Sequence, residues 1–120
     1  MQMKEIADIL QAAPLTCCDE EAMSFDLKNV FATDLMSDAL ALIQNDEEHT
    51  LLLTGLCNAQ TLRTAEMLDM KCIVFVRGKF LMDDAMRMAE EMGLTCMATD
   101  LTMYDASGRL YMNGLRGIYG

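Results

Sequence analysis

The sequence predicts a single-domain α/β sandwich, in which helices cover a mostly parallel sheet of about four to five strands. Residues 50–79 carry the clearest signal: an apolar run, a Thr-Gly turn, an amphipathic segment and a second apolar run. This is the order strand, loop, helix, strand, and a helical crossover is how parallel strands are joined. Residues 50–54 and 72–76 are continuously apolar, so we expect both strands to be buried on both faces.

Length and composition narrow the class of protein. A chain of 120 residues that is 52% hydrophobic has the length of one domain and can bury a sizeable core. A net charge of -10 repels phosphate backbones and anionic lipids, so we expect neither a nucleic acid nor a membrane as partner. Five cysteines without a C-x-x-C pair predict reduced thiols without a metal site. We therefore expect a cytoplasmic protein, because its N-terminus also lacks a signal-peptide layout.

The N-terminal part begins with an amphipathic helix. Apolar residues fall on one helical face over residues 2–12, and Pro14 ends the helix, because the residue before a proline is pushed out of the helical region. Residues 15–18 are β-prone and are predicted to form a short strand. The acidic residues 19–21 predict a solvated turn.

A second helix is predicted after a brief extended stretch at residues 30–33. Asp34 is a good N-cap for it. The expected apolar positions are Leu35, Ala39, Leu42 and Ile43. The polar residues 45–49 end the pattern and include His49, the only histidine, which we expect to be a solvated loop residue.

Another helix and strand follow the central unit. Asp83 or Asp84 is predicted to cap this helix. Gly93 is predicted to end it in the left-handed conformation. Residues 94–98 then form the next predicted strand.

The C-terminal end is predicted to be a helix followed by a loose tail. Asp100 is the expected cap of this helix, and Ser107-Gly108 inside it favours an early end. Residues 113–120 include three glycines. We expect one α/β domain over residues 1–115 and a frayed tail over residues 116–120.

Two loops are candidates for a ligand-binding site. Residues 54–58 follow the first buried strand and residues 77–79 follow the second, so both should leave the same edge of a parallel sheet. Backbone N–H groups at a helix start and two cations would attract an anion there. The residues predicted to bind a small anionic metabolite or nucleotide are Thr54, Gly55, Asn58, Arg77 and Gly78. The alternative, that the glycines only permit turns and the cations only solvate a loop, stays open.

Catalytic motifs are sparse. Cys57 and Arg63 have the C-x5-R spacing of cysteine phosphatases, in which a thiolate attacks phosphorus and an arginine clamps its oxygens. The residues between them include no glycine, which such an anion cradle needs. The nucleotide-binding glycine motifs and the zincin motif are absent. We expect no catalytic residues and no cofactor, and keep the phosphatase as an alternative.

Several segments in this order resemble the DRTGG domain. Residues 33–38 resemble the family's G-D-L-L-S segment, with Thr33 in place of the glycine. Residues 53–55 with Gln60 resemble its T-G-x-x-x-x-Q turn. The other similar segments are residues 73–78, a strand that ends in glycine, and residues 89–94 and 106–111, which match its last two helical segments. The resemblance covers residues 1–115.

The resemblance implies an α/β domain related to the N-terminal domain of HPr kinase/phosphorylase, also found in CBS-domain pyrophosphatases and beside phosphotransacetylases. In those settings the domain resembles a regulatory or oligomerising module. We therefore expect a non-catalytic regulatory or ligand-sensing module, with a protein-protein adaptor as the alternative. Thirteen methionines and a 52% hydrophobic composition also favour a homodimer, which would cover apolar surface.

Overall fold

The structure is a computed structural model that describes residues 1–120. One sheet forms its centre. Its strands are β1 (Ala13–Thr16), β2 (Asn29–Ala32), β3 (Thr50–Thr54), β4 (Cys72–Phe75), β5 (Thr95–Ala98) and β6 (Arg116–Gly117). They stand in the order β1-β5-β4-β3-β2-β6. β1 pairs antiparallel with β5, and every other neighbouring pair is parallel. The predicted α/β class with a mostly parallel sheet is confirmed.

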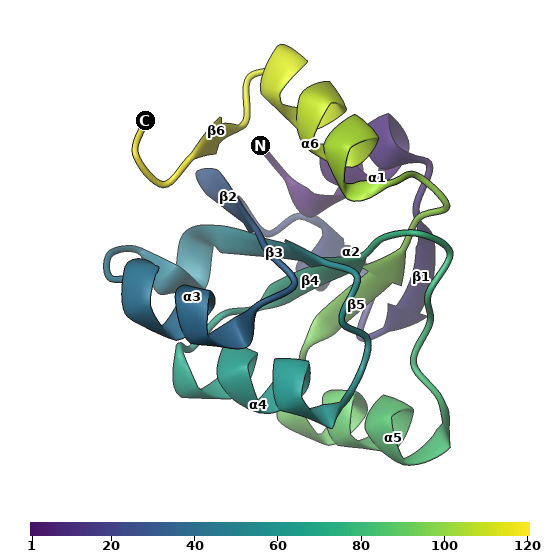
Figure 1. The fold of residues 1–120 in the computed structure, drawn as a ribbon. Helices are drawn as coiled ribbons and strands as arrows, with labels where there is room; N and C mark the ends of the chain where they lie inside the picture. Colours follow the sequence, from purple (N-terminus) through teal and green to yellow (C-terminus); the bar gives the residue numbers. More distant parts are fainter.

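The helices lie on both faces of the sheet (Figure 1). They are α1 (Met3–Leu10), α2 (Glu20–Met23), α3 (Met36–Leu42), α4 (Ala59–Met67), α5 (Asp83–Met92) and α6 (Met103–Met112), with a 3-10 turn, η1 (Glu47–His49). α1 and α6 pack together on one face, whereas α3, α4 and α5 cover the other. None of these helices has both the length and the apolar character that crossing a bilayer requires.

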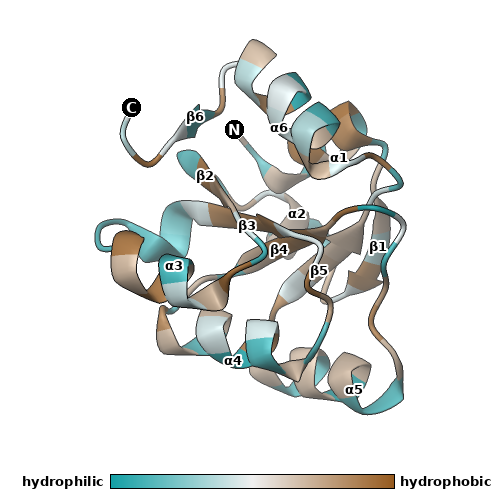
Figure 2. Cartoon of the chain, viewed as in Figure 1, coloured by the Kyte–Doolittle hydropathy of each residue, from teal (hydrophilic) through white to brown (hydrophobic).

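The two central strands are buried on both faces, as their continuous apolar runs predicted. Every residue of β3 and of β4 is buried. Leu51 and Leu53 of β3 pack into the cluster under α1 and α6, while Leu52 packs into the cluster under α3, α4 and α5. In β4, Val74 packs into the cluster under α1 and α6, and Ile73 packs into the cluster under α3, α4 and α5. Figure 2 accordingly shows strong hydrophobic colouring along the central strands.

The N-terminal segment departs from the prediction after α1. β1 occupies Ala13–Thr16, two residues earlier than predicted, and includes Pro14. A proline is tolerated because β1 is an edge strand, one side of which needs no hydrogen-bond partners. Residues 19–21 are also more than a turn. The Asp19 carboxylate accepts a hydrogen bond from the Ala22 N–H at 2.8 Å and caps α2.

The start and the buried face of α3 also differ from the prediction. Leu35 and not Asp34 is the N-cap residue, and no side chain caps the helix. The residues that α3 and its C-cap bury are Met36, Ala39 and Ile43. Leu35 is 57% exposed and Leu42 is 42% exposed. The apolar residues of this segment are numerous enough to fit two helical faces, and packing against the sheet selects one of them.

The predicted cap of α5 is wrong as well. Met82 is the N-cap residue and makes no side-chain cap hydrogen bond, so Asp83 and Asp84 lie inside the first turn. Carboxylates in that turn still interact favourably with the helix dipole. Gly93 has a φ of 72° at the end of α5, which confirms its predicted left-handed conformation.

α6 is capped by Thr102 and not by Asp100. The Thr102 hydroxyl accepts a hydrogen bond from the Asp105 N–H at 3.3 Å. The helix then continues through Ser107 and Gly108, so this pair does not end it. Burial of apolar residues on the opposite side of α6 outweighs the poor helix propensity of the pair.

The tail that was expected to fray contributes an edge strand. Leu115 is only 2% exposed and anchors the chain after α6. Arg116 and Gly117 then pair in parallel with Asn29 and Val30 of β2. A buried leucine just before it thus holds the start of the segment 116–120 against the sheet.

The corrected face of α3 can be tested by paired substitutions. Met36→Ala should lower the free energy of unfolding by about 2–5 kcal/mol, because it leaves a cavity in the core. Leu42→Ala should lower it by less than about 1 kcal/mol, because that side chain is largely exposed. Urea denaturation of the two variants measures both values. Equal losses would contradict the observed orientation of α3.

Candidate functional site at the carboxyl edge of the sheet

The two predicted loops meet at the carboxyl edge of β3 and β4. The Val76 N–H donates to the Thr54 carbonyl at 2.9 Å, which holds the two strand ends together. Beyond them, the Arg77 guanidinium reaches back over the first loop, and its Nη2 lies 3.4 Å from the Gly55 carbonyl oxygen. The structure therefore brings together Thr54, Gly55 and Arg77, three of the five predicted ligand-binding residues.

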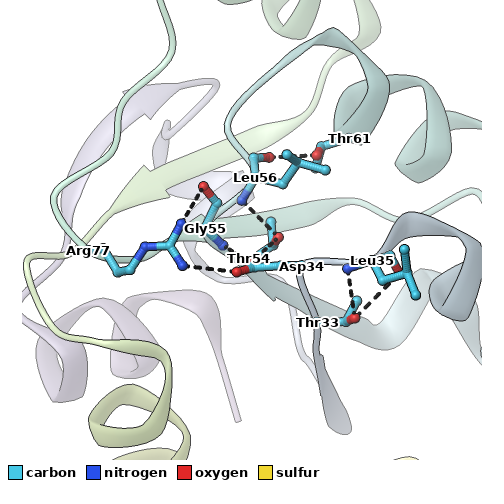
Figure 3. Close-up of polar contacts among 8 residues, drawn as sticks. All are labelled: Thr33, Asp34, Leu35, Thr54, Gly55, Leu56, Thr61 and Arg77. Carbon is cyan, nitrogen blue, oxygen red and sulfur yellow. Dashed lines mark hydrogen bonds and ion pairs between the residues drawn. The ribbon is translucent and has the colours of Figure 1, made fainter.

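A carboxylate that the sequence assigned to a helix cap occupies the centre of this site. Asp34 follows β2, and its Oδ1 accepts hydrogen bonds from the Gly55 N–H at 2.7 Å and the Thr54 hydroxyl at 3.2 Å. Its Oδ2 accepts from the Arg77 guanidinium at 2.9 Å. Figure 3 shows these side chains converging from three different loops. The donors that we expected to bind a ligand anion thus bind the carboxylate of the protein itself.

Gly55 is required by the close approach of the arginine. A Cβ atom on Gly55 would lie 2.5 Å from both Cζ and Nη2 of Arg77. Atoms cannot approach so closely, so any larger residue would push the guanidinium away. The glycine was predicted to bind a ligand, with a turn role as the alternative, and in the structure its missing side chain makes room for the arginine.

The electrostatics of Asp34 reflect competing effects. Partial burial alone would raise its pKa, but the hydrogen bonds from Gly55, Arg77 and Thr54 outweigh burial and hold this pKa below its usual value. The side chains of Asp34 and Arg77 are 45% and 44% exposed. Because solvent screens such a pair, it contributes less than about 1 kcal/mol to stability. The pair is therefore accessible to a competing ion.

Arg77 and Gly78 follow β4 and lie beside the loop after β5, where the chain changes to the other face of the sheet. Both have a positive φ, 63° for Arg77 and 70° for Gly78. Their N–H groups donate to the carbonyls of Leu101 at 2.8 Å and Thr99 at 3.0 Å in the loop after β5. The loop after β4 leads to α5 and the loop after β5 leads to α6 on the opposite face, so this is a topological switch point.

The predicted residues Asn58 and Gly78 do not join the Asp34 cluster. The Asn58 side-chain oxygen Oδ1 accepts a hydrogen bond from the Thr61 N–H at 3.2 Å and caps α4. The Gly78 N–H is already used in the contact with the loop after β5. Their assignment to a ligand site stays a prediction, whereas Asp34 is a member of the cluster that sequence reasoning missed.

The phosphatase alternative requires Cys57 to be a reactive thiolate and Arg63 to bind the phosphate oxygens. Burial raises the pKa of the Cys57 thiol to about 11, although Lys79 opposes this effect. A thiol with such a pKa is protonated near neutral pH and is a poor nucleophile. Arg63 is exposed on α4. The raised thiol pKa does not favour thiolate chemistry at this position.

His49, the only histidine, lies at the opposite end of β3 from this site. His49 precedes β3, whereas the Asp34 cluster follows β3. Its ring stacks on Phe25 with a centroid distance of 5.3 Å, and its Nδ1 is buried without a hydrogen-bond partner. His49 is therefore partly packed and partly open to solvent, with 33% of its side chain exposed. It is also not placed to serve as a base for the cluster.

This site belongs to an α/β domain whose accessible carboxyl edge is the usual ligand position of open sheets. No protein-family model and no curated protein matches the sequence. The fold does match a crystal structure of the CBS and DRTGG domains of the regulatory region of Clostridium perfringens pyrophosphatase, complexed with the activator diadenosine tetraphosphate. The TM-score is 0.73 at 20% sequence identity. The match covers 98% of this chain and 49% of that chain, so this chain spans about half its length. The likeness supports a DRTGG-like fold.

A double-mutant cycle tests the contact between Gly55 and Arg77. Gly55→Ala should lower the free energy of unfolding by about 1 kcal/mol in the presence of Arg77 and by much less in an Arg77→Ala background. The reason is that the new methyl group collides with a guanidinium that the second variant lacks. Urea denaturation measures the coupling. As a control, Arg87→Ala on α5 should add simply to Gly55→Ala, and simple addition for Arg77→Ala would contradict the contact.

Proposed function

We propose that this chain is a non-catalytic, cytoplasmic regulatory module that senses a small anionic or nucleotide-like ligand and acts as a homodimer. One observation carries the ligand part of the proposal. A backbone N–H, a hydroxyl and a guanidinium converge on the oxygens of Asp34, and these are the donors with which proteins bind phosphate. The site is preorganised for an oxyanion, because its donors are held at the ends of buried strands.

Asp34 makes this site a sensor and not a permanently open anion site. A ligand phosphate would replace the carboxylate on Arg77 and on the Gly55 N–H. Asp34 would then be released, and α3 begins two residues after it. The contacts of Asp34 restrain the loop that leads into that helix, together with the Thr33 hydroxyl, which accepts a hydrogen bond from the Leu35 N–H at 3.0 Å. Ligand binding would thus be transmitted to the position of α3.

The structural neighbour gives this proposal independent support. Its regulatory region is complexed with diadenosine tetraphosphate, which is an activator of that pyrophosphatase. Polyphosphorylated nucleotides present several oxyanions, each of which suits a cluster of this kind. At 20% identity the ligand itself is not transferred, so we propose the chemical class and not the particular compound.

The ligand site is tested by an NMR titration with inorganic phosphate and a panel of nucleotides and sugar phosphates. The amide signals of Gly55, Asn58 and Gly78 should shift. Arg77→Ala should abolish the shifts, because it removes the guanidinium. Asp34→Asn should tighten binding by up to about fivefold, because an exposed ion pair worth less than about 1 kcal/mol no longer competes.

The control for this titration is Arg87→Ala, which removes an exposed guanidinium on α5 and should leave binding unchanged. Weaker binding by Asp34→Asn would show that the carboxylate helps the ligand and does not compete with it. If no anion in the panel shifts these amide signals in the native protein or in Asp34→Asn, the ligand proposal is wrong. The protein-protein adaptor would then be the better description.

The absence of turnover is tested with a generic aryl phosphate substrate. We expect no hydrolysis above background, because the Cys57 thiol is protonated near neutral pH. Cys57→Ser provides the control for contaminating phosphatases. Turnover that disappears in Cys57→Ser would establish the phosphatase alternative and overturn the non-catalytic assignment.

A further inference from the structure

The outer face of α6 carries large side chains that are mostly exposed, and among them Tyr111 is partly covered by the Arg116 guanidinium, 5.1 Å from its ring centroid. Tyr104 is 86% exposed, Tyr111 is 60% exposed and Met112 is 87% exposed. Beside them a groove of about 560 Å³ runs between α6 and β2, with Val30 and Ala32 in its wall. Tyrosine and methionine are enriched in protein interfaces, and a cluster of this kind is unusual on a solvent-facing helix.

Gly108 lies at the centre of this exposed face. Ala106 and Leu110 are fully buried, so the residue between them lies on the side of α6 that does not enter the core, where it lines the groove. Glycine is unfavourable inside a helix. A Cβ atom added to Gly108 would find no atom within 4 Å, so nothing within this chain requires the missing side chain. The vacant position is open to an external partner.

Tyr104 and Tyr111 flank this vacant position. They are four residues before and three residues after Gly108, and these spacings place all three on one helical stripe. The same surface therefore carries bulky side chains and a hollow beside them. A two-fold symmetric interface requires both on one patch, because the patch must be complementary to itself.

The net charge of the segment that contains α6 also favours contact with a second copy of the chain. Residues 101–120 contain one aspartate and two arginines and have a net charge of +1, whereas the whole chain has a net charge of -10. Two copies repel each other least through this segment. Asp105 and Arg109 lie one turn apart on α6, and neither takes part in an ion pair within the chain. The Asp105 carboxylate accepts a hydrogen bond from the Thr102 hydroxyl at 3.1 Å, and both side chains are exposed, so the two charges can pair across an interface.

We propose that a second copy of this chain docks on α6, with the two α6 helices antiparallel about a two-fold axis at Ser107 and Gly108. This inference rests on the homodimer in the proposed function and assigns its interface. In this arrangement Tyr104 of one protomer lies opposite Tyr111 of its partner, over the hollow left by Gly108. Asp105 of one protomer then approaches Arg109 of its partner.

A single symmetric arrangement thus uses the tyrosines, the glycine and both charges. An unrelated protein would have to supply a complementary ridge and complementary charges of its own. The second copy already has them in the required order. For this reason we assign the surface to self-association and treat other partners as outcomes of the test.

The interface is tested by sedimentation equilibrium of the full chain over a range of about 5 to 500 µM, because dimer population depends on concentration. The native protein should shift from its monomer mass of 13.4 kDa towards a dimer. Gly108→Arg should weaken the dimer by at least about tenfold, because it fills the hollow and adds charge at the axis. Met67→Arg on α4, at a side chain that is 71% exposed, is the matched control and should leave the dimer unchanged. Circular dichroism verifies that both variants are folded.

A charge-reversal pair makes the test independent of the glycine. Asp105→Arg and Arg109→Asp should each weaken the dimer, and the double variant should restore it, because the two charges meet across the two-fold axis. A dimer that Gly108→Arg and both reversals leave intact would overturn the α6 interface but keep the homodimer. A native protein that is monomeric at every concentration would overturn both. Neither result bears on ligand sensing, which the phosphate titration decides separately.

Discussion

The burial of β3 and β4 on both faces is the constraint on which the rest of the structure depends. A strand that packs helices against both faces can be continued only through crossovers, and these place parallel strands side by side. The side chains of β3 alternate between the two clusters, with Leu52 on one face and Leu51 and Leu53 on the other. All loops that follow these parallel strands therefore reach the same edge. The candidate site exists because that edge collects the ends of β2, β3 and β4.

At this edge, polar groups are bonded within the chain and still open to water. Arg77 is held between the Asp34 carboxylate and the Gly55 carbonyl, and the absence of a side chain on Gly55 permits this approach. An exposed ion pair adds little stability. The role that we assign to this pair is therefore exchange, in which a ligand anion replaces the Asp34 carboxylate on Arg77. A carboxylate on phosphate-type donors is a natural competitor of an anionic ligand. This relation joins a local contact to the regulatory role that we propose.

The two proposed activities use different but neighbouring parts of the molecule, since the groove beside α6 includes Ala32, two residues before Asp34. The ligand cluster lies at the loops that lead into α3, α4 and α5, whereas the proposed dimer surface is the outer face of α6. The two regions are linked through the backbone contact between Arg77 and Leu101, at the switch point between the faces. Because α6 begins two residues after Leu101, a change at the ligand site has a short covalent and hydrogen-bonded route to the dimer surface.

The sequence by itself determined the fold class, the strands β3 and β4, and the left-handed Gly93, because these follow from local apolar patterns and from the conformational preferences of single residues. It also placed Thr54, Gly55 and Arg77 at one edge, since parallel strands align their carboxyl ends. Only the tertiary structure decided the role of Asp34. As a local signal this residue looked like a helix cap, but its partner Arg77 is 43 residues away. The face of α3 and the pairing of Arg116 with β2 likewise depended on long-range packing. Such contacts have no signature in the spacing of neighbouring residues, which is the physical reason why the sequence alone did not reveal them.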